Sequence, residues 1–400
     1  MLNRQKVLQA LEATRDQFHE YEADQVRQRD LIWQLFSQFA QFDRQTILDR
    51  LAQRDIAWPG ARPTPEIDEA SDLRMPFAPR WQTHEEARTW ALTVLRDRPV
   101  IAVDGSQITP TKDFSIPVGA VQIGWFVNYH RSGGQYIKDV EFEVLGPAEL
   151  EGAEDDTDSN GNFPNWLVNQ KRFVGECRQL CRLMAEHASL PEDQRPVCFL
   201  DGSLVISFAG QMRRERAKPY IDAVTELLAC SERHRVPLVA YVDTSYSRDL
   251  VTLVQVLTNA TGGSSLSDAG MLGNTLSNWG DRSPFFICAR RDELSKDGRA
   301  EFYNDIAFAY LRVVQGRSPV RVEVPRWLVE RGPVEAVIDI VRAECVVGAG
   351  YPYAVETADA VAVLSQQDRQ RFYALWQQFL AGENVTLTQA RKAGSKLGRR

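Results

Sequence analysis

Two short apolar runs in this sequence each end in the same tripeptide, Asp-Gly-Ser. The first run is IAVDGS at 101–106 and the second is FLDGS at 199–203. Short apolar runs bounded by turn residues are typical of buried strands, and α/β sheets bind ligands beyond the carboxyl ends of their strands. The sequence therefore predicts that Asp104 and Asp201 share a hard cation, Mn²⁺ or Mg²⁺, in one crevice.

The glycine after each aspartate lets the chain turn sharply and lets a ligand come close. With two metal ions, one activates water and the other steadies the leaving oxygen of a phosphodiester. Ser106 and Ser203 follow in the same tripeptides and are candidates for phosphate binding. The alternative is that each Asp-Gly is only an exposed turn, and it stays open without a third element.

A third carboxylate is predicted on the helix expected at 164–188. This helix runs antiparallel to the strand that follows it, so its N-terminal half lies near Asp201. Glu176 and Glu186 are the candidates, and they are roughly 15 Å apart along a helix axis. Glu176, nearer the helix start and beside the buried face, is the better ligand. The alternative is a flank glutamate that pairs with Arg172 or Arg213.

The third strand, expected at 237–242, is followed by Asp-Thr-Ser-Tyr-Ser and then Arg248. The planar guanidinium of Arg248 could clamp a phosphate. The alternative is a surface arginine that opens a helix.

Further along, Tyr351 precedes a helix that carries Glu356 and, three residues later on the same face, Asp359. Asp359 could complete a metal shell, and Tyr351 could hold a phosphate or stack on a base. The alternative is a helix begun by proline, with acidic residues placed favourably in its first turn.

The elements around these residues predict an α/β fold with a mixed sheet flanked by helices. A strand ending at Asp104, a hairpin and a helix come first, then a strand, a helix and a third strand. Their expected ranges are 99–103, 115–127 with 136–145, 164–188, 197–200, 213–234 and 237–242. Strands at 284–289 and 305–314 and helices at 332–346 and 354–365 follow. This order matches a ribonuclease H-like fold.

The two ends of the chain lie outside this core. Residues 1–56 show apolar positions at helical spacing and predict two helices, either a helical hairpin or a dimerisation arm. Residues 57–78 carry four prolines and predict a linker. The predicted organisation is thus a helical arm with its linker (1–78), an α/β core domain (79–365), and a helix with a basic tail (366–400). Within the domain, 259–283 is rich in Gly, Ser and Asn and is expected to be a mobile surface region.

The composition is ordinary for a soluble globular protein, with 44% hydrophobic and 25% charged residues among 400. No run approaches the length of a membrane span, and the polar N-terminus is not a signal peptide. The six cysteines are scattered in apolar segments, as expected in a reducing cytoplasm. A net charge of −7 argues against a broad basic surface for binding nucleic acid. It does not exclude a metal site, because bound metal ions would offset part of the negative charge of the carboxylates there.

Taken together, five segments resemble the NurA nucleases, DNA-end-processing enzymes that work with the hexameric HerA translocase. They are IAVDGSQ (101–107), the helix around Glu176, FLDGSL (199–204), VDTSYSRDL (242–250) and GYPYAVETADAVA (350–362). The resemblance spans roughly residues 98–365. It implies a ribonuclease H-like fold, Mn²⁺-dependent endonuclease and 5′-to-3′ exonuclease activity on single- or double-stranded DNA ends, a role in double-strand break resection and repair, and a homodimer.

Carried over by position, the resemblance places Asp104, Glu176, Asp201 and Tyr351 in the catalytic site. The family commonly has histidine where this chain has Asp359, and often lysine where it has Arg248. Aspartate can still bind a hard metal but cannot act as a neutral imidazole ligand. A catalytically weakened module that binds DNA ends or the translocase is therefore the alternative to an active metal-dependent deoxyribonuclease.

Overall fold

The computed structural model describes residues 2–151, 165–260, 266–290 and 302–388, and its contacts divide the chain into two units. The first unit contains Met1–Arg80 and Tyr241–Glu330, and the second contains Trp81–Ala240 and Arg331–Arg400. Because the units interleave along the chain, their boundaries differ from the three predicted segments, which stay a prediction.

The sheet of the second unit carries both Asp-Gly-Ser tripeptides. Its strands are β2 (Val100–Ile108), β3 (Gly119–Asn128), β4 (Tyr136–Leu145), β5 (Val197–Asp201) and β6 (Leu238–Val242), the last of which crosses into the other unit. They lie in the order β4-β3-β2-β5-β6, with β2 antiparallel to β3 and parallel to β5. Numbered along the chain this order is 3-2-1-4-5, that of the ribonuclease H-like fold, so the predicted fold class is confirmed.

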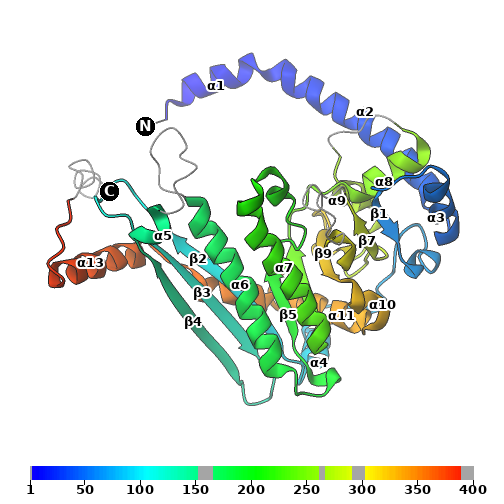
Figure 1. The fold of residues 1–400 in the computed structure, drawn as a ribbon. Helices are drawn as coiled ribbons and strands as arrows, with labels where there is room; N and C mark the ends of the chain where they lie inside the picture. The colour runs from blue at the N-terminus through cyan, green and yellow to red at the C-terminus, as the bar shows by residue number, and fades with distance from the viewer. Residues whose placement is uncertain (1, 152–164, 261–265, 291–301, 389–400) are drawn as a thin grey trace. The chain divides into compact units, whose positions relative to one another are not determined.

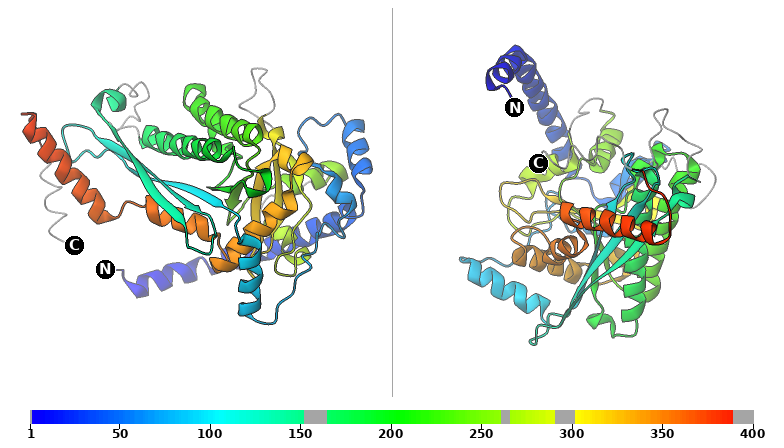
Figure 2. Two further views of the ribbon diagram at one scale, coloured as in Figure 1. Left: turned by 90° about the horizontal axis from the view of Figure 1, so that it is seen from below. Right: turned by 90° about the vertical axis from the view of Figure 1, so that its left-hand side faces the viewer.

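Helices cover both faces of this sheet (Figures 1 and 2). α6 (Asn165–His187) packs against β2 and β3 on one face, with α7 (Arg214–His234) beside it. α12 (Tyr353–Ala362) packs on the other face, and α4 (His84–Leu95) packs against α11 (Val334–Val347). The helical period predicted for α6 is confirmed at Cys177, Leu180, Leu183 and Met184, which are buried, whereas Trp166 and Phe173, also expected to face inward, are only partly buried. The remaining elements of this unit are α5 (Pro147–Glu151), η3 (Glu192–Gln194), η4 (Ser207–Gln211) and α13 (Gln366–Gly382).

The first unit has a smaller antiparallel group of strands. These are β1 (Gly60–Pro63), β7 (Phe286–Ala289), β8 (Ile306–Leu311) and β9 (Val320–Pro325), in the order β1-β7-β8-β9. Helices of the same unit are α3 (Arg44–Gln53), η1 (Pro65–Asp68), α8 (Asp249–Thr258), α9 (Asp268–Thr275), η6 (Phe302–Asp305) and α10 (Arg326–Arg331). β9 was not predicted, since its charged Arg321 and Glu323 interrupt the apolar pattern although both are buried.

Two predictions for this unit are wrong. Residues 57–78 are not a linker, because β1 pairs with β7 and Glu66 accepts two hydrogen bonds of 2.8 Å from Arg282. The described part of 259–283 is not a loose surface region either, because it contains α9 and the buried Asp281 and Arg282. In both segments the polar residues find partners inside the unit, which composition alone cannot reveal.

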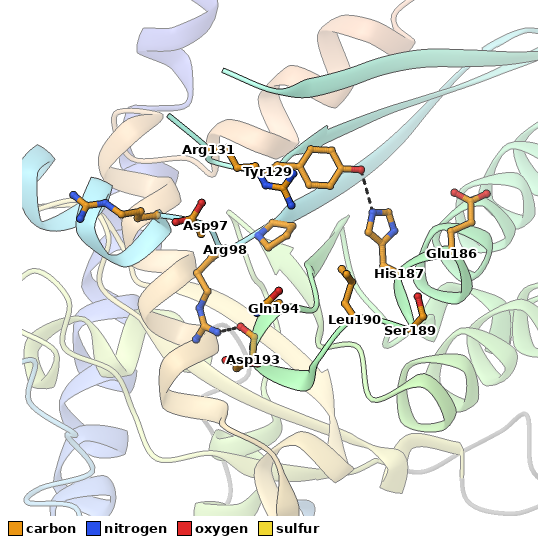
Figure 3. Close-up of a pocket in the computed structure, with 12 residues that line it drawn as sticks. Asp97, Arg98, Tyr129, Arg131, Glu186, His187, Ser189, Leu190, Asp193 and Gln194 are labelled. Carbon is orange, nitrogen blue, oxygen red and sulfur yellow. Dashed lines mark hydrogen bonds between the residues drawn. The ribbon is translucent and has the colours of Figure 1, made fainter. Parts of the chain in front are cut away.

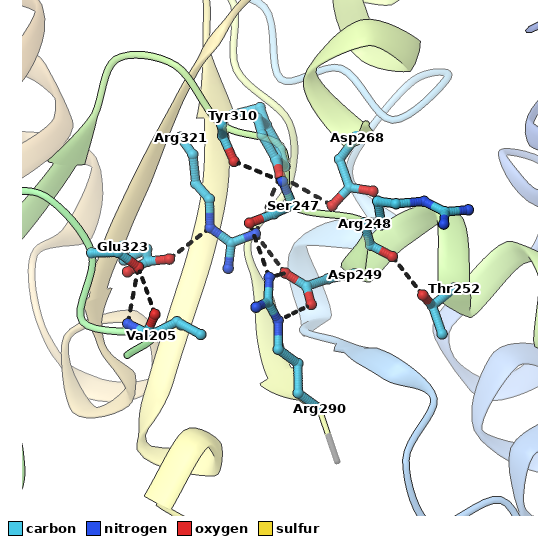
Figure 4. Close-up of polar contacts among 12 residues, drawn as sticks. Val205, Ser247, Arg248, Asp249, Thr252, Asp268, Arg290, Tyr310, Arg321 and Glu323 are labelled. Atoms are coloured by element: carbon cyan, nitrogen blue, oxygen red, sulfur yellow. Dashed lines mark hydrogen bonds and ion pairs between the residues drawn. The ribbon is translucent and has the colours of Figure 1, made fainter. Parts of the chain in front are cut away.

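A network of buried charges holds α8 to the strands of this unit (Figure 4). Asp249 accepts from Arg321 at 2.6 Å and from Arg290 at 2.9 Å, while Arg321 also donates to Glu323 at 2.7 Å. Although burial opposes it, the two arginine charges hold the pKa of Asp249 below its usual value. Removing one member would leave a buried charge uncompensated, which costs far more than a surface ion pair.

The N-terminal region contains α1 (Arg4–Ala13) and α2 (Arg15–Phe39), joined at Thr14, in addition to α3. Figure 1 shows α2 leading away from α1 and not folding back beside it, so the predicted helical hairpin is not what forms here. Only the C-terminal half of α2 is anchored, through the buried Ile32, Phe36 and Phe39. Of the helices that the structure describes, none combines the length and the apolar character needed to cross a membrane.

Candidate active site

The sequence had suggested that Asp104 stands at the end of its strand. In the structure it lies within β2, which continues to Ile108. The parallel pairing of β2 with β5 stops at Val103 opposite Leu200, whereas the antiparallel pairing with β3 continues to Ile108 opposite Ala120. Beyond Val103 the β5 side of β2 therefore no longer has its strand neighbour. Asp104 is the first residue of β2 beyond this point. The site therefore opens where the neighbouring strand β5 ends, and not where β2 ends.

Asp201 is the last residue of β5, as predicted. Gly202 follows with φ +118°, a conformation that side chains disfavour, so glycine allows the chain to turn away at once. The Asp201 side chain is exposed, and the hydroxyl of Tyr351 donates to its Oδ1 at 2.7 Å. The structure thus brings Tyr351, predicted from the late Gly-Tyr-Pro, directly onto the second aspartate.

Glu176 reaches the same place from α6. A Cβ at position 105 would come within 2.5 Å of Glu176 Oε1, so glycine is required there for the glutamate to lie against the backbone next to Asp104. Glu176 is 4% exposed and forms an ion pair with Arg172, which also donates to the Gly105 carbonyl at 3.4 Å. Glu186, the rejected candidate, is exposed and pairs with Arg182 at 3.0 Å.

Asp359 comes from α12 on the other face of the sheet and lies close enough to Asp104 to raise the pKa of the Asp104 carboxyl. The helix is fixed close to the sheet, because a Cβ at Gly124 would lie 2.7 Å from the backbone nitrogen of Ala362. Its first turn is held by the fully buried Glu344, whose Oε2 accepts from the Ala354 amide at 2.7 Å. The helix that carries Asp359 is therefore anchored at both ends.

The electrostatics show how closely these groups are gathered. Burial and, to a lesser extent, the charges of Asp201 and Asp359 together raise the pKa of Asp104 to about 6, against a hydrogen bond from the Gly105 amide. Burial also raises the pKa of Glu176 to about 8, although Arg172 opposes this and the charges of Asp104 and Asp201 add to it. Carboxyl groups that disfavour each other's ionisation are ready to accept a cation.

The predicted phosphate-binding residues have local structural partners. Ser106 Oγ accepts from the Leu364 amide at 3.2 Å, and Ser203 Oγ accepts from the Val205 amide at 3.0 Å. Arg248 lies in the first unit, at the N-cap of α8, where its Nε donates to the Leu266 carbonyl at 3.0 Å. These contacts do not test a role in phosphate binding, which stays a prediction for all three.

Sequence reasoning missed two residues that shape the site. Arg172 was considered only as an ion-pair partner, and its position four residues before Glu176 is the signal that places it there. Its contact with the Gly105 carbonyl could not be anticipated, because that contact joins α6 to β2. Glu344 carried no signal, since a glutamate inside an apolar helix gives no indication of what it caps.

A separate cavity of about 670 Å³ lies in the same unit (Figure 3). Its lining includes Arg98 and Pro99 before β2 and Asp193 before β5, so it lies at the opposite ends of these strands from Asp104 and Asp201. The Tyr129 hydroxyl and His187 Nε2 lie 3.3 Å apart within it. It contains none of the residues predicted for the acidic site.

The acidic site has the right donors for a hard divalent cation, since all are carboxylate oxygens. In the described residues, however, no three His, Cys, Asp or Glu side chains already stand in the arrangement of a metal cage. Two observations account for this: Glu176 is engaged by Arg172, and like charges repel when no cation lies between them. The donor set therefore fits a hard divalent cation.

A family model described as the NurA domain matches residues 98–364. Among solved structures, a crystal structure of NurA with manganese has 10% identity and a TM-score of 0.40, covering 71% of this chain and 89% of that one. A crystal structure of NurA bound to dAMP and manganese has 10% identity, a TM-score of 0.35, and coverage of 70% and 88%. The catalytic domain of human Endonuclease V has 13% identity, a TM-score of 0.31, and coverage of 70% and 92%. A search of curated proteins found no match.

Proposed function

This chain belongs to the NurA family, and from that premise we propose that it is a divalent-metal-dependent nuclease that hydrolyses phosphodiester bonds at DNA ends. One observation carries the proposal. Asp104, Asp201, Asp359 and Glu176 come from two strands and two helices, yet they influence one another's ionisation at a single point of the sheet. Clustering of this kind is costly and is typical of a functional site.

The residues that would hold the metal are Asp104 and Asp201, with Glu176 and Asp359 on either side. A Mn²⁺ or Mg²⁺ ion bound there would polarise a phosphate oxygen and make water a better nucleophile at neutral pH. Tyr351 orients Asp201 through its hydroxyl. Arg172 compensates the charge of the buried Glu176, and its planar guanidinium also suits a phosphate.

The proposal has further parts. We propose endonuclease and 5′-to-3′ exonuclease activity on single- or double-stranded DNA, with a role in end resection and repair. We also propose a homodimer, a HerA-type hexameric ATPase as partner and a cytoplasmic location. They are supported by membership of the NurA family. Co-elution of the chain with a HerA-type ATPase in gel filtration tests the partner, and separate elution of the two at micromolar concentration would contradict it.

The central test is cleavage of linear DNA with Mn²⁺ by the purified wild type, Asp104→Asn and Asp201→Asn. Both variants are expected to abolish cleavage. Asp139→Asn is the matched control, because Asp139 is an exposed aspartate on β4 of the same sheet. Retained activity in the Asp104 variant would sink the proposed mechanism.

A catalytically weakened binding module remains the second candidate, favoured by Asp359 in place of the family histidine and by the absence of a preformed cage among the described residues. Calorimetric titration with Mn²⁺ separates the two candidates. A nuclease shows a site that is lost in Asp201→Asn, whereas the weakened module shows no such site in the wild type.

A further inference from the structure

A buried glutamate joins a histidine to the first turn of α12. Glu344, on α11, has a side chain that is 0% exposed, and that of His130, in the connection between β3 and β4, is 13% exposed. Glu344 Oε1 lies 3.4 Å from His130 Nε2. The other carboxylate oxygen, Oε2, accepts from the Ala354 amide at the start of α12. His130 is therefore linked through a single side chain to the helix that carries Asp359.

The contacts of the His130 ring decide how many protons it carries. Nδ1 lies 2.7 Å from the backbone carbonyl oxygen of Arg98. A carbonyl oxygen can only accept, so Nδ1 carries a hydrogen. In a neutral imidazole Nε2 would then be an acceptor, and its lone pair would face the Glu344 carboxylate. The contact is favourable only when Nε2 carries a proton as well, so that His130 is an imidazolium.

Glu344 has no other partner on this side. Its Oε1 is buried and accepts no hydrogen bond from the described part of the chain. A buried carboxylate oxygen without a partner is costly. The negative charge stays on Glu344, because Oε2 accepts an amide at the positive end of the α12 dipole. The structure thus sets an imidazolium against the buried carboxylate that holds a helix in place.

The backbone of His130 keeps the ring in this position. Its φ of +49° lies in the left-handed region, which is uncommon for residues other than glycine. Its amide donates to Asn128 Oδ1 at 3.1 Å, and its carbonyl accepts from the Asp97 amide at 3.3 Å. Both backbone groups are therefore fixed, and the ring is held between the Arg98 carbonyl and Glu344.

Other charged or titratable groups on the surrounding elements are engaged elsewhere. The Arg98 guanidinium donates to the Asp193 carbonyl, and Arg342 on α11 forms ion pairs with two acidic residues of its own helix. On α12, the Tyr353 ring packs edge-on against Phe126. α4, which packs against α11, buries only apolar side chains. Among the described residues, the proton between the histidine and the glutamate is therefore the charge that can change here.

We propose that His130 and Glu344 are positioning residues for the acidic site: a proton on His130 Nε2 fastens the first turn of α12, and loss of that proton loosens the helix that carries Asp359. Histidine ordinarily loses its charge between pH 5 and 8. The paired form is the protonated one, so the fastening is present at low pH and is lost as pH rises through this range. The fastening does not depend on nuclease activity, whereas its effect on a metal ion rests on the proposed function.

Hydrogen exchange of the α12 amides in EDTA, corrected for the intrinsic effect of pH, measures the fastening. In the wild type, protection is expected to fall about tenfold from pH 6 to pH 8, because a hydrogen bond to a charged group is lost. His130→Gln puts a neutral amide donor in the place of Nε2 and should keep high protection at both pH values. His130→Asn keeps a donor for the Arg98 carbonyl and suits the left-handed backbone, but it cannot reach Glu344, so protection should be low at both.

His187→Asn is the matched control. His187 is another partly buried histidine of this unit, and its ring nitrogens face the Tyr129 hydroxyl and the Leu183 carbonyl and not a carboxylate. This variant should show the same fall in α12 protection as the wild type. Protection that does not change between pH 6 and pH 8 in the wild type, or that falls equally in His130→Gln, would overturn the inference.

Calorimetric titration with Mn²⁺ at pH 6, where the wild type is fastened, tests the link to Asp359. His130→Asn should bind Mn²⁺ several-fold more weakly than the wild type, and His130→Gln about as tightly. Equal affinity of His130→Asn and the wild type would contradict the positioning role. If none of these proteins binds Mn²⁺ while the exchange results are as expected, the proposed function fails and the fastening of α12 stands.

Discussion

Neutralising Asp104 should make the metal-free protein more stable while it destroys the metal site. Burial and the charges of Asp201 and Asp359 raise the pKa of Asp104 from 3.8 to about 6. Above pH 6 the carboxyl is ionised in both the folded and the unfolded chain, so the folded state bears an electrostatic cost of roughly 3 kcal/mol. Asp104→Asn removes this charge in a side chain of nearly the same size.

Water reaches one side of Asp104, so we expect a net gain of about 1–2 kcal/mol at pH 7.5, or an increase in Tm of about 2–4 °C. The sign follows from the raised pKa: the folded state binds the proton more tightly, and the cost grows as pH rises from about 4 to 6. The gain should therefore shrink as pH falls below 6 and disappear below about pH 3, where the carboxyl is protonated in both states.

Differential scanning calorimetry in EDTA and then in Mn²⁺ measures the effect. At a metal concentration 100 times Kd, binding stabilises the wild type by about 2.7 kcal/mol, so the order of the two proteins should reverse. Asp139→Asn should change neither result. Equal or lower stability of Asp104→Asn in EDTA at pH 7.5, or an undiminished gain at about pH 3, would refute the electrostatic reasoning.

Four further outcomes are expected. Tyr351→Phe removes a hydrogen bond to a charged oxygen and should weaken Mn²⁺ binding about tenfold in calorimetry, whereas an unchanged Kd would contradict the orienting role. Arg172→Gln should raise the pKa of Glu176 above its value of about 8, so that Mn²⁺ affinity falls more at pH 7 than at pH 9; an equal loss at both pH values argues against it. Asp359→His should shift activity toward Mn²⁺ relative to Mg²⁺, and an unaltered activity ratio would exclude Asp359 from the shell. Asp249→Asn should destabilise the protein by about 3–5 kcal/mol at pH 7, because it leaves the buried Arg321 without its ion pair. The pKa of Asp249 is lowered in the folded state, so the stability that its charge contributes is lost only as pH falls below about 4. Thermal unfolding that matches the wild type would contradict this.

Much of the core was predictable from local pattern. The apolar runs ending at Asp104 and Asp201 and the helical period around Glu176 predicted the strands and helix that the structure contains. These signals survive in sequence because burial imposes a period of about 3.6 on a helix and a run of apolar residues on a central strand. Helix polarity was then enough to choose Glu176 over Glu186.

Where polar residues find partners at long range, the sequence was misleading. Glu66 and Arg282 looked like members of loose segments, although they bind each other across the chain. β9 went unrecognised for the same reason, because its Arg321 and Glu323 are buried through pairing and not through being apolar. Such partners are far apart in sequence, so no local pattern records them.

What the sequence determined by itself is the chemistry available: two Asp-Gly-Ser tripeptides, further carboxylates and a tyrosine, all oxygen donors suited to a hard cation. Tertiary structure decided how they meet. It showed that Asp104 lies where β5 stops and not where β2 ends, that Tyr351 donates to Asp201, and that Arg172 forms an ion pair with Glu176. The physical reason is that residue type is a local property, whereas a shifted pKa and an opened strand edge depend on neighbours that only folding brings together.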